Sequence, residues 1–341
     1  PAALALIKRL GLEGEVTGTN PEFRNSYILR HGKLRVIPEG FFLLAPARWL
    51  PFMLSPLLSL PGKLRAGLDL VLPRGPVLAD ESLASFVTRR LGHEVFDWLA
   101  QPLVSGIYTA DASTLSLRAT FPAFLELERK YRSIILGLRL SQTRAAASAS
   151  GARYSLFATM RSGLTGLVEA VAGRLPAGSV KCSSPVMGIR RTGNCWTVAI
   201  RDGAEITGDA VVVAVPAPAA ATLIRETDQK LSDLLFKIPY ASTATVTVGF
   251  NRSQVAHHLR GFGFVVPHAE GRRLLACTFS NVKFPARGSG DRVLLRMFIG
   301  GAPDPGVALM EPAKIDVLDL SDLREILGNT RDPLFTETAR Y

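Results

Sequence analysis

Cysteine is scarce in this chain of 341 residues, which has three cysteines. Three cysteines without paired spacing cannot build a small disulfide-stapled scaffold, and they fit a reducing cytosol. The ordinary role of such residues is that of small hydrophobic side chains. We therefore expect Cys182, Cys195 and Cys277 to be buried in the core.

The motifs of common catalytic sites are absent as well. The five histidines form no H-E-x-x-H pair, so the sequence predicts no metal site. It has no G-x-S-x-G elbow, no P-loop lysine motif and no G-x-G-x-x-G turn after a strand. Aromatic residues make up 8% of the chain and do not alternate with basic residues, which argues against nucleic acid as a partner. By its own motifs the chain therefore shows neither a catalytic side chain nor a dinucleotide site.

Apolar residues and positive charge are plentiful. Hydrophobic residues make up 47% of the chain, which excludes disorder. Its length suggests two domains. The net charge of +11 suggests an anionic partner, either nucleic acid, anionic lipid or a polycarboxylate ligand, and composition does not choose among them.

The longest apolar segment runs from Phe41 to Leu60 and has one charged residue, Arg48. Its length would suit a membrane span, but Pro46, Pro51 and Pro56 each remove a helix hydrogen bond. Two interpretations stay open: a buried wall around an apolar ligand, or a surface that enters one leaflet of a bilayer. Basic residues that would suit anionic headgroups follow the segment, at Lys63, Arg65 and Arg74.

The spacing of apolar residues divides the chain into a helical part and a later β-rich part. Apolar residues that recur every three or four positions predict helices from Asp80 to Leu140. The small residues of Thr143–Ser150 predict a linker. Ala210–Val215 is uniformly apolar and predicts a strand buried on both faces, which ends at Pro216. Other strands are predicted over 185–189, 195–200, 242–250, 261–266, 274–279 and 293–299. The fold class is mixed α/β without an internal repeat.

Three long segments, Leu10–Gly40, Pro102–Gly137 and Gly261–Gly301, resemble a known family. Within them stand NPEFRNSYI, PLVSGIY, GFGFVV and RMFIGG. Together they resemble the oxygen-dependent protoporphyrinogen and coproporphyrinogen oxidases, which are flavoproteins of the amine-oxidase-like superfamily.

The resemblance implies an α/β (α+β) architecture with three kinds of domain. We expect a partial FAD-binding Rossmann-like domain in 1–20 and 151–230, a helical membrane-binding domain in 21–145 and a β-rich substrate domain with a mixed sheet in 231–341. The family's glycine-rich FAD turn and its closing segment have no counterpart here, so we expect a fragment of a longer chain that binds FAD poorly by itself.

The function implied by the resemblance is FAD-dependent oxidation of protoporphyrinogen IX or coproporphyrinogen III in haem biosynthesis. O2 would be the acceptor and H2O2 the product. We expect peripheral contact with the cytoplasmic face of a membrane through residues 41–75, and a homodimer stays open. Two alternatives remain: another flavoenzyme of this superfamily, such as a carotenoid desaturase or an amine oxidase, or a non-catalytic remnant that binds a tetrapyrrole or a membrane.

The resemblance also implies binding residues. Val186, Ala214 and Pro216 match positions near FAD. Because flavin takes the hydride, no catalytic side chain is expected. On the substrate side the matching positions are Gly106, whose carbonyl would face the tetrapyrrole, the apolar Phe262, Val265 and Phe298 around its rings, and Arg24 as the partner of a propionate. Ser26 stands where some relatives carry that arginine.

Overall fold

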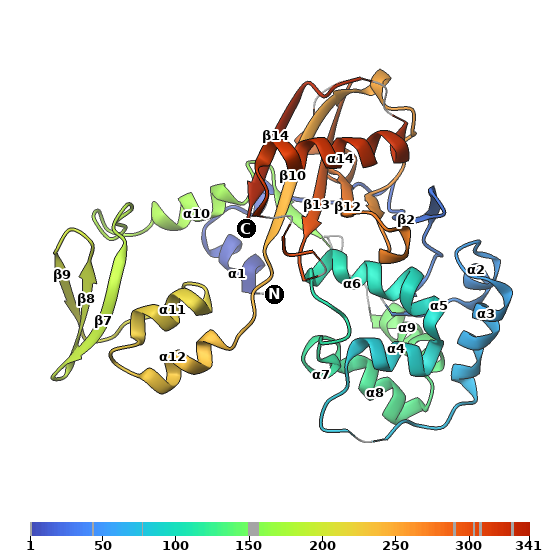
Figure 1. Cartoon of the computed structure of the whole chain (residues 1–341), viewed down its shortest axis with the longest axis horizontal. Helices are drawn as coiled ribbons and strands as arrows, with labels where there is room; N and C mark the ends of the chain where they lie inside the picture. The colour runs from blue at the N-terminus through green and yellow to red at the C-terminus, as the bar shows by residue number, and fades with distance from the viewer. Residues whose placement is uncertain are drawn as a thin grey trace. The chain divides into compact units, whose positions relative to one another are not determined.

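The computed structural model in Figure 1 describes residues 2–42, 44–76, 78–148, 157–288, 291–302, 304–306, 309–328 and 331–341. The chain forms two compact units, each assembled from two separate stretches. The first unit is Pro1–Glu13 with Ser162–Tyr240, and the second is Gly14–Arg161 with Ala241–Tyr341. The assignment of flavin, substrate and membrane roles to particular ranges stays a prediction.

A seven-stranded mixed sheet forms the centre of the second unit, in the order β14-β10-β13-β12-β11-β2-β3. The pair β11–β2 is parallel, whereas the neighbouring pairs are antiparallel. The strands are β2 (Tyr27–Arg30), β3 (Lys33–Val36), β10 (Thr243–Asn251), β11 (Gly263–Val265), β12 (Leu274–Phe279), β13 (Arg292–Gly300) and β14 (Phe335–Arg340). Four of these match predicted strands, while the hairpin β2–β3 and the strand β14 were missed.

One face of this sheet is covered by helix α14 (Pro312–Leu327), which Figure 1 shows lying across the strands. Residues of β10 alternate between buried and half-buried, as expected for a strand with one covered face. The buried positions of the sheet form an apolar cluster with Ile315, Leu323 and Leu327 of α14. On the other face, Val265 of β11 packs against the apolar cluster of the helical part of the unit.

The rest of the second unit is mainly helical and has its own apolar cluster. Ser82 caps the helix that follows it by accepting a hydrogen bond from the backbone N–H of Ser85, so the predicted helix start is confirmed. The helices are α2 (Trp49–Leu54), α3 (Leu60–Gly67), α4 (Leu83–Leu91), α5 (His93–Val95), α6 (Gln101–Tyr108), α7 (Leu117–Thr120), α8 (Pro122–Tyr131), α9 (Ile134–Ser148) and α13 (Ser280–Lys283), with a π-helical turn over Phe96–Ala100. Two short β pairs complete the unit, β1 (Val16–Gly18) with β6 (Ala158–Met160) and β4 (Phe41–Phe42) with β5 (Ala45–Pro46).

The predicted linker over Thr143–Ser150 is wrong for its first part. Helix α9 continues through Ser148, while Ser150 lies outside the described residues. The physical reason is composition, because the stretch is rich in alanine, which has the highest helix propensity of all residues.

The first unit combines helices with a three-stranded antiparallel sheet. The strands β7 (Val186–Thr192), β8 (Cys195–Ile200) and β9 (Glu205–Gly208) form a meander, and the helices are α1 (Ala2–Arg9), α10 (Thr165–Ala172), α11 (Ala217–Ile224) and α12 (Gln229–Phe236). Cys182 and Cys195 are exposed here, so the expectation of three buried cysteines holds only for Cys277.

The predicted buried strand over Ala210–Val215 is wrong. This segment has no strand assignment, and Val212, Val213 and Val215 are 90%, 38% and 45% exposed. A strand exists only where its backbone groups pair with a neighbour. Among the described residues none pairs with this segment, so its apolar side chains remain on the surface.

Candidate functional site

Val265 and Phe298, two of the predicted substrate residues, lie on the less covered face of the sheet. Val265 pairs with Ala276 on the neighbouring strand, and Ala276 pairs with Phe298 on the next. Directly paired residues place their side chains on the same face of a sheet. The half-buried Val265 and Phe298 therefore lie on either side of the small Ala276 side chain.

Helix α6 brings Gly106 to this face. A Cβ at Gly106 would lie 3.3 Å from Cγ1 of Val265, so the two predicted positions are neighbours. The end of α6 is held to the sheet, because the Thr109 carbonyl accepts a hydrogen bond of 2.9 Å from the Ala302 N–H. Gly301 allows this close approach, since a Cβ there would lie 2.7 Å from the Thr109 oxygen. The structure thus assembles Gly106, Val265 and Phe298 into one apolar corner.

Phe262 lies beside the segment that carries Arg24. Its N–H donates a hydrogen bond of 2.8 Å to the Asn25 carbonyl, and the Asn20 N–H donates one of 2.9 Å to the Lys283 carbonyl. Both ends of the 20–25 segment are therefore fixed beside Phe262 and Lys283. The Arg24 side chain is exposed, and among the described residues no carboxylate pairs with it.

Lys283 is a candidate binding residue that the sequence did not reveal. Its ammonium lies 4.5 Å from the ring centroid of Phe157, 5.6 Å from that of Phe284 and 5.7 Å from that of Phe262. Burial lowers the pKa of Lys283 below its usual value. Phe284 directly follows Lys283, but Phe157 and Phe262 are distant in the chain, so no local pattern predicts this site.

The three residues predicted to contact FAD lie in the first unit and are exposed. Val186 begins β7 and pairs with Ile200, while Ala214 and Pro216 belong to the segment without strand pairing. Nothing in the described part of the first unit encloses them. By themselves, these residues therefore do not form a flavin pocket.

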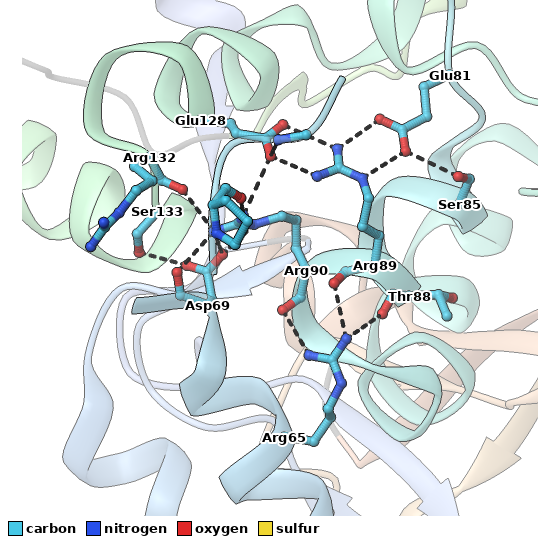
Figure 2. A network of polar contacts seen from close by, with 12 residues as sticks. Arg65, Asp69, Glu81, Ser85, Thr88, Arg89, Arg90, Glu128, Arg132 and Ser133 are labelled. Atoms are coloured by element: carbon cyan, nitrogen blue, oxygen red, sulfur yellow. Dashed lines mark hydrogen bonds and ion pairs between the residues drawn. The ribbon is translucent and has the colours of Figure 1, made fainter. Parts of the chain in front are cut away.

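A dense polar network holds the helical part of the second unit together (Figure 2). Arg89 on α4 forms ion pairs with Glu81 at 2.9 Å and with Glu128 of α8 at 2.6 Å. Burial would raise the pKa of Glu128, but hydrogen bonds from Arg89 and Gly75 hold it below its usual range. This arrangement fixes α4 against α8 rather than leaving a charge free for a ligand.

The centre of the network is the buried pair of Arg90 and Asp69. The guanidinium of Arg90 is 2.5 Å from Oδ1 of Asp69, and their side chains are 1% and 0% exposed. Asp69 also accepts hydrogen bonds from the Ser133 hydroxyl and the Ile135 N–H. Figure 2 shows these groups converging on one point between the helices.

Arg65 is one of the three basic residues that would suit lipid headgroups if the apolar segment met a bilayer, but in the structure its guanidinium has partners within the fold. Its guanidinium donates to the carbonyls of Thr88, Arg89 and Arg90 at the end of α4 (Figure 2). Carbonyls at the end of a helix lack partners within it and carry partial negative charge, so they attract a cation. Arg65 thus stabilises α4.

Comparison with known proteins places the chain among flavoenzymes. The family described as "Flavin containing amine oxidoreductase" matches residues 1–341. The chain is 33% identical to the coproporphyrinogen III oxidase of Bacillus subtilis (strain 168), over all of this chain and 72% of that protein. It is 33% identical to the chloroplastic protoporphyrinogen oxidase of Oryza sativa subsp. japonica, over 90% of this chain and 60% of that protein.

Solved structures show the same relationship. The "putative protoporphyrinogen oxidase" of Exiguobacterium sp. 255-15 aligns with a TM-score of 0.85 and 26% identity, covering 99% of this chain and 72% of that one. A redesigned putrescine oxidase aligns with a TM-score of 0.66 and 12% identity, covering 99% of this chain and 70% of that one. The second likeness shows the shared fold alone.

Proposed function

The chain belongs to the flavin-containing amine oxidoreductase family, and within it we propose oxidation of a porphyrinogen to the porphyrin in haem biosynthesis. The observation that most strongly supports this proposal is sequence similarity over the whole chain to relatives named as porphyrinogen oxidases. The Bacillus subtilis protein is 33% identical. The structure of a putrescine oxidase shares 12% identity and the fold alone, so it lends no support to amine oxidation. A non-catalytic remnant that contacts only a membrane would need no apolar corner of the kind formed by Gly106, Val265 and Phe298. A remnant that binds a tetrapyrrole is distinguished from the enzyme by the activity experiment below.

The chain's own residues would bind and orient the substrate. A porphyrinogen is a large apolar ring system with carboxylates at its rim, so it needs apolar walls and a few cations. Val265, Phe298 and Phe262 would pack against the rings beside Gly106, and Arg24 would meet a propionate. The bound flavin, which we propose to be FAD, supplies the acceptor for a hydride from a methylene bridge, and O2 is the final acceptor.

For the cofactor, we propose that Val186, Ala214 and Pro216 lie along FAD when it is bound. The exposed apolar segment 210–215 supports this assignment, because apolar side chains that stay on the surface commonly mark a binding face. Flavin absorbance after loading with FAD and removal of the free cofactor provides the test. If wild type retains flavin, equal retention by Val186→Asp would contradict the contact at Val186.

The experiment on activity uses the chain saturated with FAD and offers each porphyrinogen separately under air. Porphyrin fluorescence should appear with coproporphyrinogen III or protoporphyrinogen IX, and H2O2 should form with it. Flavin bound in full, with no porphyrin formed from either, would reject the substrate class. The ratio of the two rates would identify the preferred substrate.

We also propose that the surface of α2 and α3 contacts one leaflet of an anionic membrane on its cytoplasmic side. The apolar segment from Phe41 to Leu60 divides in two: Leu44, Phe52 and Leu57 are fully buried, whereas other leucines point outward. Among the described residues, no helix is both long and apolar enough to cross a bilayer. The exposed leucines are Leu50 at 70%, Leu54 at 75%, Leu60 at 65% and Leu64 at 61%.

Liposome flotation tests this contact. Burial of each leucine would stabilise the bound state by roughly 1.5–3 kcal/mol, so Leu54→Asp with Leu64→Asp should reduce flotation more than tenfold. Leu309→Asp is the control, because Leu309 is 77% exposed and lies outside α2 and α3. Equal flotation of wild type and the double variant would contradict the proposed surface. Flotation that requires phosphatidylglycerol would support a contribution from Lys63 and Arg74.

A further inference from the structure

The ammonium of Lys283 is partly removed from water, and among the described residues it has no polar partner. Its side chain is half-buried on α13. Among the described residues, no carboxylate or other acceptor lies within hydrogen-bond distance of its Nζ, although three phenylalanine rings surround it. The ammonium carries three donors, and in the described part of the chain no group accepts from any of them.

The aromatic rings alone do not explain this arrangement. A cation over a ring gains about 0.5–2 kcal/mol, depending on how far it is removed from water. Withdrawing an ammonium from water opposes that gain. Burial lowers the pKa of Lys283, and among the described residues no charged group or hydrogen bond opposes that effect. The fold therefore holds a cation whose charge would be stabilised by an anionic oxygen from outside the chain.

The position of Lys283 identifies the direction from which that oxygen would come. Phe262, whose ring faces the ammonium, is one of the residues proposed to pack on the porphyrinogen rings. The backbone of Lys283 binds Asn20, the first residue of the segment that carries Arg24. A ring system packed on Phe262 would bring its rim carboxylates toward this cation.

We infer that Nζ of Lys283 binds a rim carboxylate of the substrate, in addition to the propionate contact expected of Arg24. The inference rests on the proposed porphyrinogen function and adds a substrate-binding residue to it. The contact is an ammonium–carboxylate ion pair with a charge-assisted hydrogen bond, formed beside the rings of Phe157, Phe262 and Phe284. No bond is made or broken by Lys283.

The experiment measures binding rather than turnover, with stable porphyrins as probes for the full chain. Coproporphyrin III carries four carboxylates, and its tetramethyl ester carries none. Lys283→Met should weaken binding of coproporphyrin III about tenfold or more, as expected for a charged hydrogen bond, and should leave the ester unchanged. Lys283→Arg should restore most of the affinity. Lys130→Met is the matched control, because Lys130 also lies over a ring, that of Tyr131, but is exposed.

The possible results distinguish a failure of the Lys283 contact from a failure of the proposed porphyrinogen function. Equal binding of coproporphyrin III by wild type and Lys283→Met would overturn the role of Lys283 alone. Failure of the wild type to bind either porphyrin would overturn the proposed function and the inference with it. If Lys283→Met instead loses FAD while it keeps the porphyrin, the anion is a cofactor phosphate and the inference is wrong.

Discussion

Arg90 and Lys283 are both cations withdrawn from water, but their surroundings differ. Arg90 is 1% exposed and donates to the Asp69 carboxylate and to the carbonyls of Asp69, Pro73 and Arg132. Lys283 is half-buried and has aromatic rings around it, with no carboxylate partner in the described part of the chain. One cation is surrounded by acceptors from its own fold, and the other is not.

This difference separates a structural charge from a binding charge. A buried pair with all its hydrogen bonds made holds three helices in one arrangement, and removal of either partner leaves the other charge uncompensated. A cation left without an acceptor gives the fold little stability, so a ligand better explains why a lysine stands at this position. The two sites should therefore respond in opposite directions to the same kind of substitution.

Asp69→Ala should produce the largest effect. It leaves the guanidinium of Arg90 without its carboxylate and removes the acceptor of Ser133 and Ile135, so we expect a loss of about 3–5 kcal/mol in the free energy of unfolding. Urea unfolding followed by circular dichroism measures it. Asp291→Ala, at an exposed position of the same unit, serves as control and should change stability by less than about 0.5 kcal/mol. Equal midpoints for the two variants would refute a structural role of the network.

The second largest expected effect is on the pH dependence of unfolding, which should differ between the polar network and Lys283. The pKa of Glu128 is depressed in the fold below its ordinary value of 4.5, so its contribution is present above that pH and lost as pH falls through the folded pKa. The pKa of Lys283 is depressed below 10.5, so the unfolded state binds more protons and stability rises as pH approaches that value. Urea midpoints compared between wild type, Glu128→Gln and Lys283→Met test both signs. The loss of stability at acid pH should be smaller in Glu128→Gln than in wild type. The gain of stability at alkaline pH should be smaller in Lys283→Met than in wild type.

The sequence predicted those parts of the fold that depend on local pattern. Strands over Cys195–Ile200 and Leu274–Phe279 agree with the structure residue for residue, because short runs rich in apolar residues define them. The family resemblance is confirmed by the match over the whole chain. Ala210–Val215 failed because an apolar run becomes a strand only when a partner pairs with it.

The candidate site shows a similar limit. Val265, Phe298 and Gly106 were identified by resemblance, and the structure brings them together, although their contact with substrate remains a prediction. Lys283 was missed because two of its rings, those of Phe157 and Phe262, come from distant positions that only the tertiary fold brings beside Phe284. Sequence spacing carries no information about such a cluster.

Lys283→Met should have the smallest effect on stability and the opposite sign from Asp69→Ala. The methionine fills similar space against the three rings without a charge to desolvate, so we expect no loss and a gain of up to about 1 kcal/mol. Replacing a functional residue commonly raises the free energy of unfolding, because its charge binds a ligand and destabilises the free protein. Thermal unfolding beside Lys130→Met gives the comparison. A loss of more than about 1 kcal/mol would place Lys283 with Arg90, as a cation that its own fold requires.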